Sequence, residues 1–150
     1  MKLFFALLLI LPALPAKAAE TLPYFTGFEP LRAQTPAPQI LVLLFSQPEC
    51  VYCDLVRGDF LLPIHRKQQS ELIVRELKVP GAGMIKTGDH QPETPSTFAQ
   101  RYGIKFFPSV LMLGLDGMAL GEPLVGISSR DFYGYYLDQA IEQALMHTQP

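Results

Sequence analysis

The chain has 150 residues, which is enough for one domain with a sizeable core and too few for two comfortable domains. Its formal net charge is -2, and its basic and acidic residues are interspersed, so it offers neither a basic surface for nucleic acid nor a polybasic stretch for anionic lipid. We therefore expect a single domain that binds no nucleic acid and has no stable membrane association. No separate dimerisation segment is visible in the sequence, so we expect a monomer.

The amino-terminal stretch, residues 1–18, has the pattern of a secretory signal peptide. Lys2 supplies a basic start, residues 3–14 form an apolar run broken by Pro12, and residues 16–18 are a small-x-small cleavage site. The run is shorter than the roughly 20 apolar residues that span a bilayer. We therefore expect cleavage after residue 18 and a mature protein in an oxidising, extracytoplasmic compartment, the periplasm.

The next segment, residues 19–39, is rich in proline and has no sustained periodicity. It is predicted to be an irregular lead-in or tether, with a short helical turn near residues 28–33. The domain proper is predicted over residues 40–150. Its first element is the apolar run at residues 40–45, which is typical of a central strand covered on both faces.

The chain's only two cysteines follow in the motif Cys50-Val51-Tyr52-Cys53. Two residues between the sulfurs suit the first turn of a helix, where both side chains come within disulfide reach. The first cysteine then lies at the helix amino terminus, where free amides and the macrodipole stabilise a thiolate. Cys50 is therefore the candidate nucleophile and Cys53 the resolving cysteine. The same spacing can also bind a metal or form a permanent disulfide, and both alternatives stay open.

The helix that starts at the motif is predicted to end early or to bend, because Gly58 and Pro63 interrupt it. A strand is predicted over residues 72–77, followed by a long polar loop over residues 80–95 that is either mobile or functional. The spacing then predicts a short helix from Thr94, as N-cap, to residue 102.

The last third is predicted to contain a hairpin and a terminal helix. The dipeptide Asp116-Gly117 favours a tight turn between strands at residues 105–113 and 118–120. From residue 128 onwards, apolar and aromatic residues recur at helical spacing, which predicts an amphipathic helix whose aromatic stripe packs in the core.

This order of elements resembles the thioredoxin superfamily over roughly residues 40–145. Two segments carry the resemblance, Phe-Ser-Gln-Pro-Glu-Cys-Val-Tyr-Cys at residues 45–53 and Tyr-Gly-Ile-Lys-Phe-Phe-Pro-Ser at residues 102–109. The chain looks closest to the secreted branch that includes the sulfur-oxidation thioredoxins of bacteria. The resemblance implies an α/β, thioredoxin-like fold, with a central mixed β-sheet and helices on both faces.

The resemblance also implies a substrate-binding surface. It implies that Pro108 follows a cis peptide bond and lies across from Cys50, so that the Phe107 backbone can pair with an extended substrate segment. Without the resemblance, Pro108 would be an ordinary trans proline at a strand start. Gly126 would give the substrate backbone room, or would simply be a bend residue. The expected substrate-binding residues are Phe107, Pro108, Gly126, Val51 and Tyr52.

The sequence departs from the family in its charges. Thioredoxins carry a buried acid six residues before the first cysteine, whereas this chain has Leu44, so proton transfer has to use water or another group. Glu49 and Asp54 flank the cysteines, and nearby negative charge disfavours a thiolate. A less stabilised dithiol makes the disulfide a weaker oxidant, which favours reduction of substrates.

These features predict a periplasmic thiol-disulfide oxidoreductase, more specifically a protein-disulfide reductase. Cys50 would attack a substrate disulfide, and Cys53 would resolve the mixed disulfide and close the Cys50–Cys53 bond. The expected partners are disulfide-containing protein substrates and a membrane thiol electron donor, and no cofactor is implied.

Three alternatives remain. One is a disulfide oxidase or isomerase, in which the same two cysteines would form or rearrange substrate disulfides instead of reducing them. Another is a copper or zinc chaperone on a thioredoxin-like scaffold, with His90 as the third ligand. The last is a permanent disulfide in a binding domain, although so short a loop adds little stability. Haem attachment is excluded in its usual form because Asp54 stands where a histidine is required.

Overall fold

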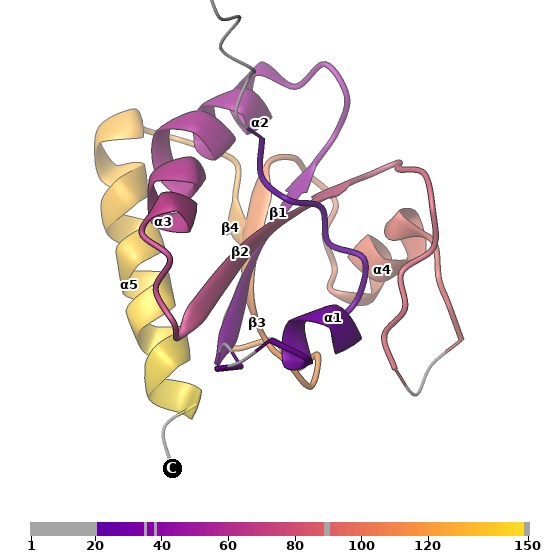
Figure 1. Ribbon diagram of the computed structural model, residues 1–150. Helices are drawn as coiled ribbons and strands as arrows, with labels where there is room; N and C mark the ends of the chain where they lie inside the picture. The colour runs from indigo at the N-terminus through magenta and orange to yellow at the C-terminus, as the bar shows by residue number, and fades with distance from the viewer. Residues whose placement is uncertain (1–20, 35, 38, 89–90, 149–150) are drawn as a thin grey trace, which may run out of the picture.

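The computed structural model describes residues 21–34, 36–37, 39–88 and 91–148, so the expected signal peptide and His90 lie outside the described residues. A sheet with strand order β2-β1-β3-β4 forms the centre of the fold (Figure 1). β1 is parallel to β2 and antiparallel to β3, and β4 is antiparallel to β3. The strands are β1 (Ile40–Ser46), β2 (Leu72–Lys78), β3 (Ser109–Gly114) and β4 (Leu124–Val125).

Helices cover both faces of the sheet, with α2, α3 and α5 on one face and α1 and α4 on the other (Figure 1). The expected α/β class with a central mixed sheet is therefore confirmed, and the structure is compatible with a thioredoxin-like fold. The helical elements are α1 (Glu29–Arg32), α2 (Val51–Leu55), the π-helical segment η1 (Val56–Leu61), α3 (Leu62–Arg66), α4 (Pro95–Arg101) and α5 (Arg130–Thr148). Among the described residues, no helix is long and apolar enough to cross a membrane.

β1 is buried along its whole length, as its unbroken apolar sequence predicts. Its side chains alternate between two apolar clusters, because successive residues of a strand point to opposite faces. Ile40 and Leu44 belong to the cluster beneath α5, whereas Leu41 and Phe45 belong to the cluster beneath α1 and α4. The strand that leads to the cysteine motif is thus held from both sides.

The lead-in differs from the irregular tether that its prolines predict. Phe25 and Phe28 are buried in the cluster beneath α1 and α4. The N–H of Phe25 donates to the carbonyl of Glu76 at 2.8 Å, and the N–H of Glu76 donates to the carbonyl of Pro23 at 3.0 Å. The described part of the lead-in therefore packs on the sheet and pairs with β2.

The chain stays helical from the cysteine motif to Arg66. Between α2 and α3, where the helix was expected to end or bend, it continues as the π-helical segment η1. Gly58 lies inside η1, so the glycine that was expected to interrupt the helix is accommodated in a π-helical turn. Pro63 lies in the first turn of α3, where its missing N–H costs little. The helix therefore does not end at these residues, and the interruption takes the form of a π-helical segment.

The hairpin turn at Asp116-Gly117 is also confirmed, since the N–H of Gly114 donates to the carbonyl of Met118 at 2.8 Å. The expected return strand is wrong, because only an isolated bridge to Ala119 forms there and pairing with β3 resumes at β4. Pro123, which has no N–H, lies between these two pairings and interrupts the ladder.

Candidate redox site

The two cysteines form a disulfide at the point where the chain leaves the end of β1 and enters α2. The sulfur atoms are 2.03 Å apart and the Cα atoms 5.1 Å apart. Cys50 is the N-cap of α2, with extended backbone angles, and its Sγ accepts a hydrogen bond from the N–H of Cys53 at 3.1 Å. The expected Cys50–Cys53 disulfide in the first turn of a helix is therefore present.

The two sulfur-bearing residues differ in exposure. Cys50 is partly exposed, whereas Cys53 is completely buried. Between them, Val51 and Tyr52 are 76% and 63% exposed. A second molecule can therefore reach Cys50 but not Cys53, as an attacking and a resolving cysteine require, although the roles themselves stay predictions.

The peptide bond between Phe107 and Pro108 is cis, as the resemblance implied. Pro108 directly precedes β3, whose first residue, Ser109, is the register partner of Phe45 near the end of β1. The cis-proline therefore lies at the same end of the sheet as the disulfide. Phe107 is half-buried and Pro108 is buried.

Gly126 lies beside the cis-proline, because its N–H donates to the carbonyl of Pro108 at 2.7 Å. Its φ of 68° lies in the left-handed region, which favours glycine. A Cβ atom there would meet nothing within 4 Å. Glycine is therefore needed for the backbone bend rather than to relieve crowding within the chain.

Exposed apolar side chains gather at this end of the molecule from three segments of the chain. We call them the apolar rim: Val51 and Tyr52 at the start of α2, Phe106 before the cis-proline, and Val125 on β4. Phe106 is 69% exposed and Val125 is 55% exposed. Sequence reasoning did not identify Val125, and its position before Gly126 was the only available signal. The rim can contact the apolar part of a substrate.

A buried acid lies next to Leu44 on the neighbouring strand. Leu44 is the register partner of Glu76 on β2, and Glu76 is only 1% exposed. Register partners point to the same face of a sheet, so the carboxylate lies on the face that carries α2. Glu76 accepts hydrogen bonds from Ser46 Oγ at 2.6 Å and from Arg57 Nε at 2.8 Å and Nη2 at 2.6 Å.

Sequence reasoning missed Glu76, although a signal was present. Leu72, Val74 and Glu76 alternate along β2, so a charged residue occupies a position of the inward face. Such a side chain needs a partner of opposite charge, and the partner, Arg57, comes from η1, about one helical turn after Cys53.

Arg57 joins this buried acid to the residue that follows the motif, since its Nη1 also donates to Asp54. The hydrogen bond to Glu76 is the main cause that raises the pKa of Arg57 above its ordinary value, and the bond to Asp54 adds to it, against the lowering effect of burial. Asp54, whose negative charge is expected to disfavour a thiolate, is thus paired with a guanidinium. Two carboxylates share one guanidinium, so one excess negative charge remains in this group.

The described residues contain no group of three or more metal-ligating side chains of the types His, Cys, Asp and Glu. His65 lies on α3 and His147 near the end of α5, on separate elements from the motif. His90, the suggested third ligand of a metal chaperone, lies outside the described residues.

No protein-family model matches the chain, and no curated protein matches it. Its likeness to the thioredoxin superfamily therefore rests on the mixed sheet, on the Cys-x-x-Cys disulfide that begins α2 and on the cis-proline at the same end of the sheet.

Proposed function

We propose that the protein is an exported, periplasmic thiol-disulfide oxidoreductase that reduces protein disulfides. The observation that carries this proposal is the Cys50–Cys53 disulfide at the start of a helix, with one partly exposed and one buried cysteine. A disulfide so placed is open to exchange at one sulfur and protected at the other.

In the reduced protein, the thiolate of Cys50 attacks one sulfur of a substrate disulfide. A bond forms between Cys50 Sγ and that sulfur, and the other substrate sulfur leaves as a thiolate that takes up a proton. Cys53 then loses its proton and attacks Cys50 Sγ, which releases the second substrate thiol and closes the disulfide. Two electrons pass from the cysteine pair to the substrate, and a membrane thiol donor returns two electrons and two protons.

The site favours the first of these steps at Cys50. The N–H of Cys53 already points to Cys50 Sγ at 3.1 Å, so this amide is in place to stabilise the negative charge of the thiolate. An extended substrate segment would pair with the backbone around Phe107 and place apolar side chains on the apolar rim. The substrates are therefore proteins whose disulfides lie next to apolar residues.

The charges near the pair support the reducing direction. Glu49 is exposed and directly precedes Cys50, and the group of Asp54, Arg57 and Glu76 retains one excess negative charge. Negative charge raises the free energy of a thiolate, so the dithiol form is less stabilised and gives up its electrons more readily.

The experiment is a trapping assay with a matched pair of variants. In Cys53→Ala, Cys50 can form a mixed disulfide that nothing resolves, so disulfide-linked substrate proteins should accumulate on it in the periplasm. Cys50→Ala has the same loss of one thiol but lacks the exposed nucleophile, and it should trap none. If Cys53→Ala also traps none, and the unmodified protein does not reduce insulin with dithiothreitol as donor, the proposal is wrong.

A further inference from the structure

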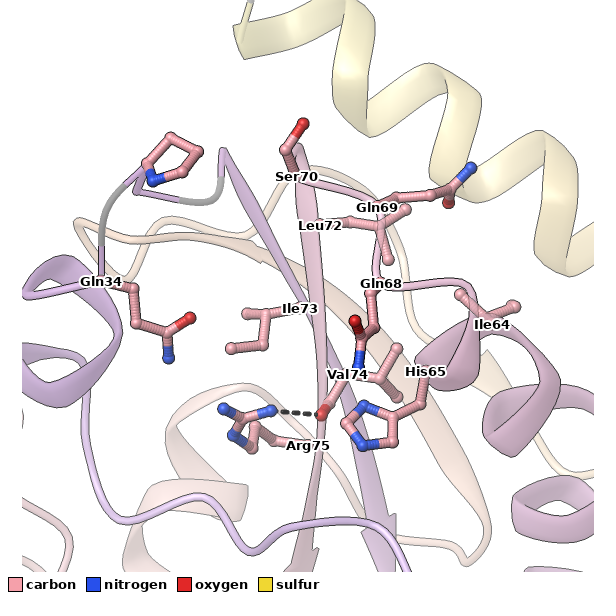
Figure 2. A pocket seen from close by; sticks show the side chains of 11 residues that line it. Gln34, Ile64, His65, Gln68, Gln69, Ser70, Leu72, Ile73, Val74 and Arg75 are labelled. Atoms are coloured by element: carbon pink, nitrogen blue, oxygen red, sulfur yellow. Dashed lines mark hydrogen bonds between the residues drawn. The ribbon is translucent and has the colours of Figure 1, made fainter.

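A cavity of about 340 Å³ lies along the outer edge of β2, away from the disulfide. Its walls come from three segments: the end of the lead-in, the end of α3 with the turn after it, and β2 itself. Figure 2 shows Gln34 and the guanidinium of Arg75 on one side of β2, and His65 and Gln68 on the other. The volume is within the range of small-molecule sites.

The cavity lies where the described lead-in no longer pairs with β2. The N–H and carbonyl of Glu76 point outward and bond to the lead-in. Because backbone direction alternates along a strand, the N–H and carbonyl groups of Leu72 and Val74 also point to this edge. The carbonyl of Val74 accepts a hydrogen bond from Arg75 Nη1 at 2.9 Å, so a side chain rather than a strand covers the edge here (Figure 2).

Arg75 has no acidic partner among the described residues, although it is half-buried. Arg57, Arg101 and Arg130 each form an ion pair with a carboxylate. Arg75 is half-buried, its single hydrogen bond is to a backbone carbonyl, and burial lowers its pKa. A guanidinium has five N–H donors, so most of the donors of Arg75 are left for another acceptor.

The remaining lining supplies side chains that can donate hydrogen bonds and, among the described residues, no carboxylate. Gln34 and Gln68 carry amides, Ser70 a hydroxyl and His65 an imidazole. One guanidinium balances the single charge of a carboxylate and matches its planar geometry, whereas a phosphate carries up to two charges and calls for more cations.

We propose that this cavity is a binding site for a carboxylate, with Arg75 as the residue that binds it. The carboxylate belongs either to a small organic acid or to an acidic side chain of a peptide. The site is separate from the redox pair, because the strand segment that lines it, Leu72 to Arg75, pairs with Ile40 to Leu43 at the start of β1, whereas Cys50 follows its end.

The test is a nuclear magnetic resonance titration of the full ¹⁵N-labelled chain with succinate, at an ionic strength held constant with sodium chloride. We expect saturable shifts at Val74, Arg75 and Gln68. Arg75→Met should weaken binding by roughly tenfold or more, since a charged hydrogen bond is lost. The matched control Lys105→Met removes an exposed cation outside the cavity and should leave the affinity unchanged.

Two further arms separate the sources of the carboxylate and guard against a folding defect. A blocked peptide with one glutamate that binds tighter than succinate indicates a peptide ligand, and the reverse order indicates a small acid. Gln34→Ala, outside the sheet, should weaken binding even if Arg75→Met does not fold. The proposal would be overturned by shifts that never saturate or that persist in both Arg75→Met and Gln34→Ala. Larger shifts with inorganic phosphate than with succinate would also overturn it.

Discussion

At the scale of single residues, the site combines a thiol pair with a charged group that reaches Asp54, the residue after Cys53. Glu76 is almost completely buried and is held by Ser46 and Arg57, while Arg57 also reaches Asp54 beside Cys53. An ion-paired group with a buried carboxylate is therefore connected to the helix that the cysteine pair begins. The effect of this charged group on the Cys50 thiolate can be measured with a variant that removes the charge of Glu76 but keeps a side chain of the same shape.

Glu76→Gln removes one negative charge and retains a side chain of the same shape. We expect the pKa of the Cys50 thiol to fall and the reduction potential to become less negative, because the thiolate is then better stabilised. The free energy of unfolding should fall by about 1–3 kcal/mol, since Arg57 loses a buried partner.

The rate of alkylation of reduced Cys50 as a function of pH measures the first effect. Glu142→Gln, which removes an exposed carboxylate on α5, is the matched control and should leave the profile unchanged. A profile for Glu76→Gln that coincides with that of the unmodified protein would show that the buried acid does not act on the cysteines.

Tyr133 gives a pH-dependent prediction that does not involve the cysteines. Its side chain is buried and its hydroxyl has no hydrogen-bond partner among the described residues, and burial raises its pKa. As the pH rises, the Tyr133 hydroxyl therefore loses its proton first in the unfolded chain, from about pH 10. The free energy of unfolding should decrease above that pH and stay constant below it.

Tyr133→Phe should remove this loss. At neutral pH we expect the free energy of unfolding to be unchanged or up to about 1 kcal/mol higher, because a buried unpaired hydroxyl is removed. Urea unfolding at pH 7 and pH 10.5 checks both statements. A variant that is clearly less stable at pH 7 would mean that the hydroxyl does have a partner.

At the scale of elements, two glycines differ in whether their backbone conformation requires glycine. Gly126 has a φ of 68°, so Gly126→Ala should cost about 1–2 kcal/mol of stability and displace the backbone next to Pro108. Gly58 has neither a positive φ nor a neighbour within 4 Å of a Cβ, so Gly58→Ala is the control and should be neutral or slightly stabilising. Denaturant unfolding with the disulfide intact distinguishes them, and equal effects would contradict this assignment.

Several elements were predictable from sequence because their local signals are strong. The apolar run at β1, the cap at Thr94 and the periodicity of α5 each fix an element without reference to the rest of the chain. The pairing of β4 was not predictable, since two residues carry little periodicity. The partners of Glu76 were not predictable either, because Arg57 and Glu76 meet only when η1 packs on the sheet.

At the scale of the whole molecule, the lead-in is an integral part of the folded domain. Four of its side chains, Leu22, Phe25, Phe28 and Leu31, are buried, and its backbone pairs with β2. Each large apolar side chain removed from a core costs about 2–5 kcal/mol, and a typical domain has only about 5–15 kcal/mol of stability.

A chain that begins at residue 40 should therefore lack cooperative unfolding, whereas one that begins at residue 19 should unfold in a single transition. Circular dichroism during urea unfolding measures this directly. A cooperative transition in the shorter chain, at a similar midpoint, would show that the lead-in is dispensable. Its prolines hid this role, because they break the periodicity from which buried segments are recognised.

The redox pair, the apolar rim and the cis-proline all lie at one end of the sheet, whereas the carboxylate cavity lies along its β2 edge. The central claim concerns the first of these regions, and the equilibrium reduction potential of the Cys50–Cys53 pair tests it most directly. We predict a value between about -200 and -280 mV, in the range of reducing thioredoxin-like couples. A value near about -120 mV would instead identify a strong oxidant, and a disulfide that thiol buffers cannot reduce would identify a structural bond.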